Sequence, residues 1–161
     1  MIDPRNVDLH EIARRGDTEI MQVFLEAGQD PNVQNEKGFG LLMLAAYYDE
    51  EDMVELLLEH GADPNLVDGS GNTPLMGMAF KGQTGIARRL LEAGADPGIA
   101  NPAGATALHF AALFNQSEMA TLLVEHGADP EAKDAEGRTP AMLAQEQGRD
   151  ELAAQLARGE S

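Results

Sequence analysis

The stretch from Thr106 to Pro130 reads TALHFAALFNQSEMATLLVEHGADP, and it decides which fold the chain can adopt. Its apolar residues recur at the helical spacing i, i+3 and i+4 in each half: Leu108, Ala111 and Ala112, then Met119, Leu122 and Leu123. This spacing predicts two short amphipathic helices of about ten residues each. Because helices of that length are not stable alone in water, they must pack against neighbouring elements.

Three residues mark where these two helices are expected to begin and end. Asn115 suits the left-handed backbone of a tight turn between them. Ser117 is expected to be the N-cap of the second helix, and Gly127 is expected to end that helix as a C′ glycine. The stretch is therefore predicted to form a helix, a turn and a second helix.

The rest of the chain repeats this stretch every 33 residues without insertion, as the positions of one glycine show: Gly28, Gly61, Gly94 and Gly127. The aspartate two residues later recurs as Asp30, Asp63, Asp96 and Asp129. Five copies are predicted, over about residues 3–35, 36–68, 69–101, 102–134 and 135–161, and together they form a single domain, 1–161. A fixed period indicates a solenoid, in which each unit buries its apolar face against adjacent units.

Three segments resemble the ankyrin-repeat family: GNTPL at 71–75, TALHFAA at 106–112 and LLLEHGAD at 56–63. The resemblance covers about Val7 to Arg158. It implies an all-α solenoid of helix-turn-helix pairs with projecting β-hairpin-like loops.

Two departures from the family pattern are expected to have local effects. Val7-Asp8 and Gly40-Leu41 replace Thr-Pro, which is expected to weaken the start of the first helix in repeats one and two. Asp49 and Asn115 replace the glycine between paired helices, and these two residue types tolerate the left-handed backbone better than most.

The chain is strongly acidic, with a formal net charge of −17 over 161 residues. This charge disfavours nucleic acid and anionic membranes, because both bind clustered lysine and arginine. Part of the charge is periodic, at Glu26, Glu59, Glu92 and Glu125. These glutamates either solvate one face or form an acidic stripe that attracts a basic protein.

The composition also bears on the compartment. Cysteine is absent, which excludes disulfides and cysteine-based metal or redox sites. The segment Met1–Asn6 lacks the basic and apolar regions of a signal peptide, and there is no run of 18 apolar residues. A cytoplasmic location without membrane insertion is therefore expected, although a leader that had been removed would leave no trace.

Groups that could carry catalysis have structural explanations. His10 and His109 occupy the Leu-His position of the family motif, where the imidazole is expected to bond neighbouring turns, while His60 and His126 precede a C′ glycine. The acidic run Asp49–Asp52 is expected on the loop between the helices of repeat two, where solvent keeps all four groups ionised. We therefore predict no enzyme activity, no catalytic or metal site and no cofactor.

The resemblance also implies where a partner would dock, namely on the ends of the first helices and on the hairpin tips. Five of the seven aromatic residues occupy these positions, whereas Phe24 and Phe110 are predicted to lie in the core. The predicted partner-binding residues are Arg14, Phe39, Tyr47, Tyr48, Phe80, Lys81, Leu113 and Phe114. The alternative is that these rings pack against the adjacent repeat.

The predicted function is that of a monomeric, non-catalytic module that binds another protein in its concave groove, and the charge favours a basic partner. One alternative is an acidic inhibitor or immunity-type protein that blocks a basic enzyme. A small enzyme or ion-dependent protein using Asp49–Asp52 is another. The repeated GADP tetrads also look like those of stand-alone bacterial ankyrin proteins, which suggests a stress-response accessory role as a further alternative.

Overall fold

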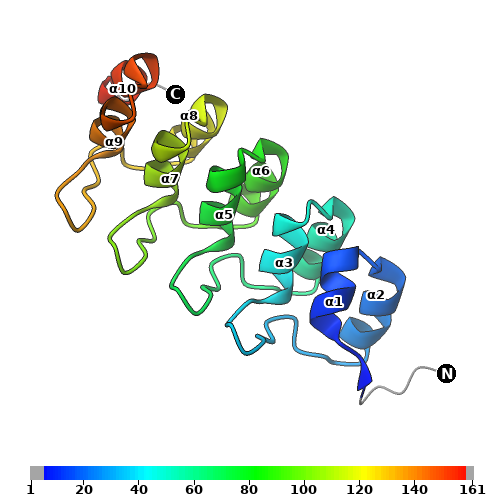
Figure 1. The fold of residues 1–161 in the computed structure, drawn as a ribbon. Coiled ribbons are helices and arrows are strands. Elements are labelled where there is room, and N and C mark those ends of the chain that lie inside the picture. The colour runs from blue at the N-terminus through cyan, green and yellow to red at the C-terminus, as the bar shows by residue number, and fades with distance from the viewer. Residues whose placement is uncertain (1–5, 159–161) are drawn as a thin grey trace.

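A computed structural model describes residues 6–158 of the chain. The segment Met1–Asn6, which was compared above with a signal peptide, lies almost wholly outside these residues. The described part contains ten α-helices that follow one another in pairs (Figure 1). They are α1 (Leu9–Arg15), α2 (Thr18–Glu26), α3 (Leu41–Tyr47), α4 (Glu51–Glu59), α5 (Pro74–Lys81), α6 (Thr84–Glu92), α7 (Ala107–Leu113), α8 (Ser117–Glu125), α9 (Pro140–Glu146) and α10 (Asp150–Ala157). The all-α repeat solenoid predicted from the sequence is confirmed.

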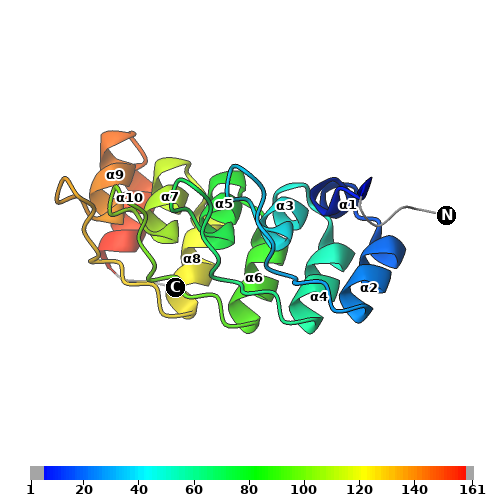
Figure 2. The same ribbon diagram turned by 90° about the horizontal axis from the view of Figure 1, so that it is seen from below.

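The helices form two layers. The odd-numbered helices lie side by side in one layer and the even-numbered helices in the other, as Figure 2 shows. The loops that join successive pairs project from the side of the odd-numbered helices (Figure 1). In the described residues these loops carry one isolated antiparallel bridge, Gln34–Gly40, instead of a regular strand pair.

A single apolar cluster runs through the stack from Ala13 in α1 to Leu156 in α10. It consists mainly of leucine, alanine and methionine. Because the alanine side chains are small, neighbouring helices can approach each other closely. Each pair is stable only because the pairs on either side cover its apolar faces.

The helix starts differ in part from the predictions. Thr73 caps α5 by accepting the Met76 N–H at 3.2 Å, whereas Gly40 makes no side-chain cap, as expected for repeat two. The predicted weak start of repeat one is wrong, because Asp8 accepts the N–H groups of His10 and Glu11. The cap has moved one residue along the chain, to the residue that replaces proline.

The predicted cap of α8 is also wrong. Ser117 is the first residue of that helix, and the N-cap residue Gln116 makes no side-chain capping bond. The Ser117 hydroxyl donates instead to Gln155 Oε1 at 3.3 Å, in the adjacent pair. The predicted turns are confirmed, since Asn115 and Asp49 have φ values of 57° and 62°.

His10 and His109 make the bonds to neighbouring turns that were predicted for them. Nε2 of His10 lies 3.2 Å from the Val33 carbonyl oxygen and 3.0 Å from that of Phe39. Nε2 of His109 lies 2.9 Å from the carbonyl oxygen of Arg138. Each imidazole therefore joins its own helix to the next hairpin.

A ladder of asparagine bonds joins the loops that follow the even-numbered helices. Asn32 Oδ1 accepts the N–H of Asp63 at 2.7 Å, and Asn65 Oδ1 accepts that of Asp96 at 2.7 Å. The next position in the 33-residue register is Gly98, which has no side chain to continue the ladder.

Replacing Gly98 with asparagine is expected to stabilise the protein by about 1 kcal/mol, because the new side-chain amide oxygen would accept the N–H of Asp129. The backbone of Gly98 is not left-handed, and its N–H bonds Asp96 as that of Asn32 bonds Asp30. The measurement is the urea-unfolding free energy, with Gly98→Ala as the control for chain stiffness. Equal stability of the asparagine and alanine variants would mean that the new bond does not form.

Candidate functional site

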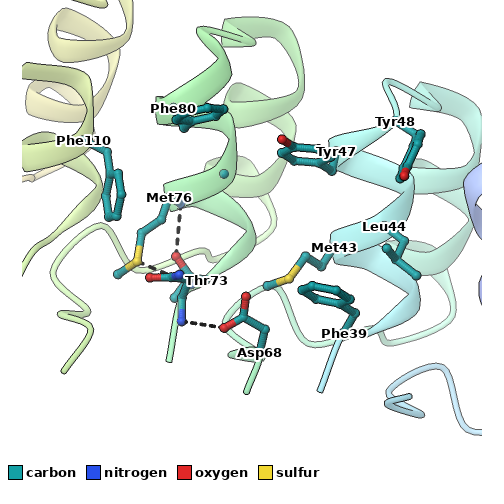
Figure 3. A pocket seen from close by; sticks show the side chains of 12 residues that line it. Phe39, Met43, Leu44, Tyr47, Tyr48, Asp68, Thr73, Met76, Phe80 and Phe110 are labelled. Atoms are coloured by element: carbon teal, nitrogen blue, oxygen red, sulfur yellow. Dashed lines mark hydrogen bonds between the residues drawn. The ribbon is translucent and has the colours of Figure 1, made fainter. Parts of the chain in front are cut away.

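Four of the predicted partner-binding residues meet in one groove between α3 and α5. The groove has a volume of about 490 Å³, and Phe39, Tyr47, Tyr48 and Phe80 are among the residues that line it. Figure 3 shows the rings of Tyr47 and Phe80 at one end and Phe39 at the hairpin end. The groove therefore spans repeats two and three.

The rings at this surface are open to solvent. Tyr47 and Phe80 are each 43% exposed, and Tyr48 is 51% exposed. Phe39 is half-buried beside them. Because large apolar side chains normally bury most of their area, this exposure is the main feature that distinguishes the groove from the rest of the surface.

Phe114 extends the aromatic surface into repeat four. Its ring centroid lies 4.6 Å from that of Phe80, at an interplanar angle of 80°. Tyr47 and Tyr48 form a second edge-to-face pair with centroids 6.0 Å apart. Such pairs hold the rings in one arrangement before any partner arrives.

Four predicted residues do not line the groove: Arg14, Lys81, Leu113 and Phe114, of which Phe114 contacts the ring of Phe80. Arg14 lies on α1 and pairs with Glu11 at 2.7 Å. Leu113 is half-buried at the end of α7.

Lys81 joins repeat three to repeat two. Its Nζ donates to the Tyr47 carbonyl oxygen and to Asp49 Oδ1, and it lies 4.8 Å from the centroid of the Tyr47 ring. Hydrogen bonds from Gln83 and then from Lys81 hold the pKa of Asp49 below its usual range. The ammonium group is therefore already engaged with this chain.

Several lining residues were missed by the sequence analysis. Met43 and Met76 contribute flexible thioether side chains, and Phe110, predicted to be a core residue, is half-buried and also faces the groove. Gly77 is the most informative, because the same register position holds Leu44 and Phe110 in the adjacent repeats. Because Gly77 has no side chain, the groove stays open at this position. An alignment of the repeats would have revealed this difference from Leu44 and Phe110.

A family model for ankyrin repeats in three copies matches residues 9–101 and 75–161, which together cover nearly the whole chain. This chain belongs to the ankyrin-repeat family. The Pseudomonas aeruginosa protein PA3287, whose name describes it as an ankyrin repeat protein, is 44% identical over 46 residues. That match covers 29% of this chain and 27% of the relative, so this chain spans about a quarter of that relative's length.

The acidic run of this ankyrin-repeat protein only partly follows its prediction. Asp49 and Glu50 lie in the turn, but Glu51 and Asp52 form the first turn of α4, where carboxylates favour the helix dipole. Glu51 also lies 3.6 Å from Arg89. Within residues 6–158, no three histidine or carboxylate side chains are grouped as a metal site would require.

One further property concerns membranes. Within the described part of the chain, no helix combines the length and the apolar character that crossing a bilayer requires.

Proposed function

We propose that this ankyrin-repeat protein binds a segment of another protein in the groove between α3 and α5 and does not catalyse a reaction. Ankyrin repeats are protein-interaction modules, which gives the general role. The observation that carries the specific proposal is the exposure of Tyr47, Tyr48 and Phe80 around one groove of about 490 Å³. Exposed rings at the centre of a surface are typical of binding hot spots.

The groove combines rigid and adaptable parts. Tyr47 and Phe80 are braced by ring contacts, whereas the half-buried thioether of Met43 can change rotamer to fit a bound side chain. We assign Phe39, Tyr47, Tyr48 and Phe80, which line the groove, to the centre of the interface, together with Phe114, whose ring contacts that of Phe80. We assign Arg14, Lys81 and Leu113 to its edge, because none of them lines the groove or adds a ring to the aromatic surface.

The charge of the protein supports a basic partner. A net charge of −17 raises the rate at which a basic protein is encountered, and this effect decreases with salt. The same charge repels nucleic acid, anionic membranes and second copies of the chain, which supports a monomer. A partner enzyme blocked by this contact would make the protein an inhibitor, and an activity assay of that enzyme would separate this role from passive binding.

The groove proposal is tested by Tyr48→Ala. Tyr48 is 51% exposed, so its truncation is expected to leave the thermal midpoint nearly unchanged and to weaken groove binding at least about tenfold. The probe is a phage library of random dodecapeptides selected on the whole chain, followed by affinity measurements with synthetic peptides.

Val23→Ala is the matched control, because Val23 is 64% exposed on α2 in the other layer. Peptides that bind the wild type and Val23→Ala but lose affinity for Tyr48→Ala support the groove. A selection in which Tyr48→Ala binds every peptide as well as the wild type would remove the proposal.

A further inference from the structure

The hairpin end of the groove carries one charged side chain. Asp68 is half-buried and lines the groove together with Phe39 and Met43, and Figure 3 shows its carboxylate at the end opposite to Tyr47 and Phe80. Among the described residues that line the groove, it is the one with a charge.

The two oxygens of Asp68 have different roles. Oδ1 accepts the N–H groups of Ser70 at 2.8 Å and Asn72 at 3.0 Å, and so closes the hairpin turn. Oδ2 has no hydrogen-bond or ion-pair partner within residues 6–158, yet it is not enclosed by protein atoms. One acceptor oxygen is therefore available beside an apolar surface.

The same turn two repeats later shows what this oxygen can bind. Asp134 Oδ1 accepts the N–H groups of Glu136 and Arg138, each at 2.9 Å, as Asp68 Oδ1 does in its own turn. Asp134 Oδ2 accepts Nε–H of Arg138 at 3.0 Å. The backbone N–H of Arg138, aided by its guanidinium group, holds the pKa of Asp134 below its usual range.

The chain does not supply this cation at Asp68. Asn72 stands where repeat five has Arg138, and its Oδ1 accepts Nδ2–H of Asn101 at 3.0 Å. The positions equivalent to Asp68 at the ends of repeats one and three hold Asn35 and Asn101, which are neutral. Asp68 therefore lies in the same kind of turn as Asp134, but the position that supplies a guanidinium group to Asp134 holds Asn72 here.

We infer that the segment bound in the groove carries an arginine whose guanidinium group pairs with Asp68, next to a large apolar side chain that lies over Gly77. This inference rests on the proposed groove function and specifies its partner. Arginine fits better than lysine for two reasons. Its planar guanidinium group can form the ion pair with Asp68 and also stack on the ring of Phe39, and it loses less hydration than an ammonium group when it leaves water. The apolar neighbour would occupy the space that Leu44 and Phe110 fill in the adjacent repeats.

Asp68→Asn removes the charge without removing the turn. Asn35 Oδ1 already accepts the N–H groups of Lys37 and Phe39, each at 3.0 Å, in the equivalent turn 33 residues earlier. Asp63→Asn is the matched control, since Asp63 Oδ1 accepts the Asn65 N–H in a similar turn but does not line the groove. Both variants change the net charge by the same amount.

The test uses dodecapeptides selected on the wild-type chain that lose affinity for Tyr48→Ala. These peptides are expected to carry an arginine next to an aromatic or aliphatic residue. Asp68→Asn is expected to weaken them at least about tenfold, and Asp63→Asn less than about twofold. Replacing the peptide arginine with uncharged citrulline should cause the same loss on the wild type and no further loss on Asp68→Asn.

Other results would overturn the inference in distinguishable ways. If peptides sensitive to Tyr48→Ala bind Asp68→Asn as tightly as the wild type, the arginine contact is wrong and the groove function stands. An equal loss on both asparagine variants would mean that bulk charge, and not Asp68, attracts the peptide. If no selected peptide is sensitive to Tyr48→Ala, the proposed function and this inference fail together.

Discussion

Gly77→Leu is expected to weaken peptide binding in the groove about 100-fold or more while the protein remains at least as stable as the wild type. A leucine at this position would fill the space between α3 and α5 that a bound side chain would occupy. A Cβ at residue 77 would lie 3.8 Å from Tyr47 Cδ2, an ordinary contact, so the substitution causes no clash at its base. Leucine also favours a helix over glycine by about 0.8 kcal/mol.

Gly85→Leu provides the matched control for this experiment. Gly85 is an exposed glycine in α6 of the same repeat, and its added Cβ would meet nothing closer than 3.6 Å. Both variants are compared by thermal unfolding and by peptide affinity. A Gly77→Leu protein that is folded and still binds the selected peptides as the wild type does would show that binding occurs elsewhere.

His109→Ala is expected to destabilise the protein by about 3 kcal/mol. The imidazole is only 1% exposed, its Nδ1 accepts the Thr106 N–H at 3.1 Å, and its Nε2 donates to the Arg138 carbonyl oxygen at 2.9 Å. Alanine would leave both backbone groups without this partner and would also create a cavity. The loss should appear as a lower free energy of urea unfolding.

The repeats provide the control for this substitution. Met43, Met76 and Met142 occupy the same register position, and Met76 Sδ accepts the Thr73 N–H at 3.5 Å. His109→Met should therefore fill the space, keep a weak bond to the helix start and cost only about 1 kcal/mol, mainly for the lost bond to the next hairpin. Equal costs for alanine and methionine would mean that neither the filled volume nor the bond to the Thr106 N–H contributes to stability here.

The sequence predicted the helices well because each apolar stripe, turn and repeat supports the same local structure. Asn115 adopts its left-handed turn for a reason that lies within a few residues of it. Ser117 was assigned wrongly because every even-numbered helix begins at this register position, so Ser117 is the first helical residue and its hydroxyl is left to bond Gln155 in the adjacent pair. Asp8 was assigned wrongly because the helix starts one residue later than in the adjacent repeats.

The groove was partly predictable. The register predicted an aromatic surface that includes Tyr47, Tyr48 and Phe80, since packing between repeats leaves those positions free. Lys81 was grouped with the partner-binding residues by its position, yet it bonds Tyr47 and Asp49 of the preceding repeat. Whether a side chain faces a partner or its own neighbour depends on the residues across the helix contact, which a register position does not specify.

The sequence alone determined the 33-residue period, the paired helices and the acidic character of this ankyrin-repeat protein, because each of these follows from local spacing or from composition. Only the tertiary structure decided that Gly77 lines a groove beside Tyr47 and that Asp68 has an unpaired oxygen at the same groove. Both properties arise where side chains from different repeats meet, so they depend on distances between helices and not on the order of residues along either one.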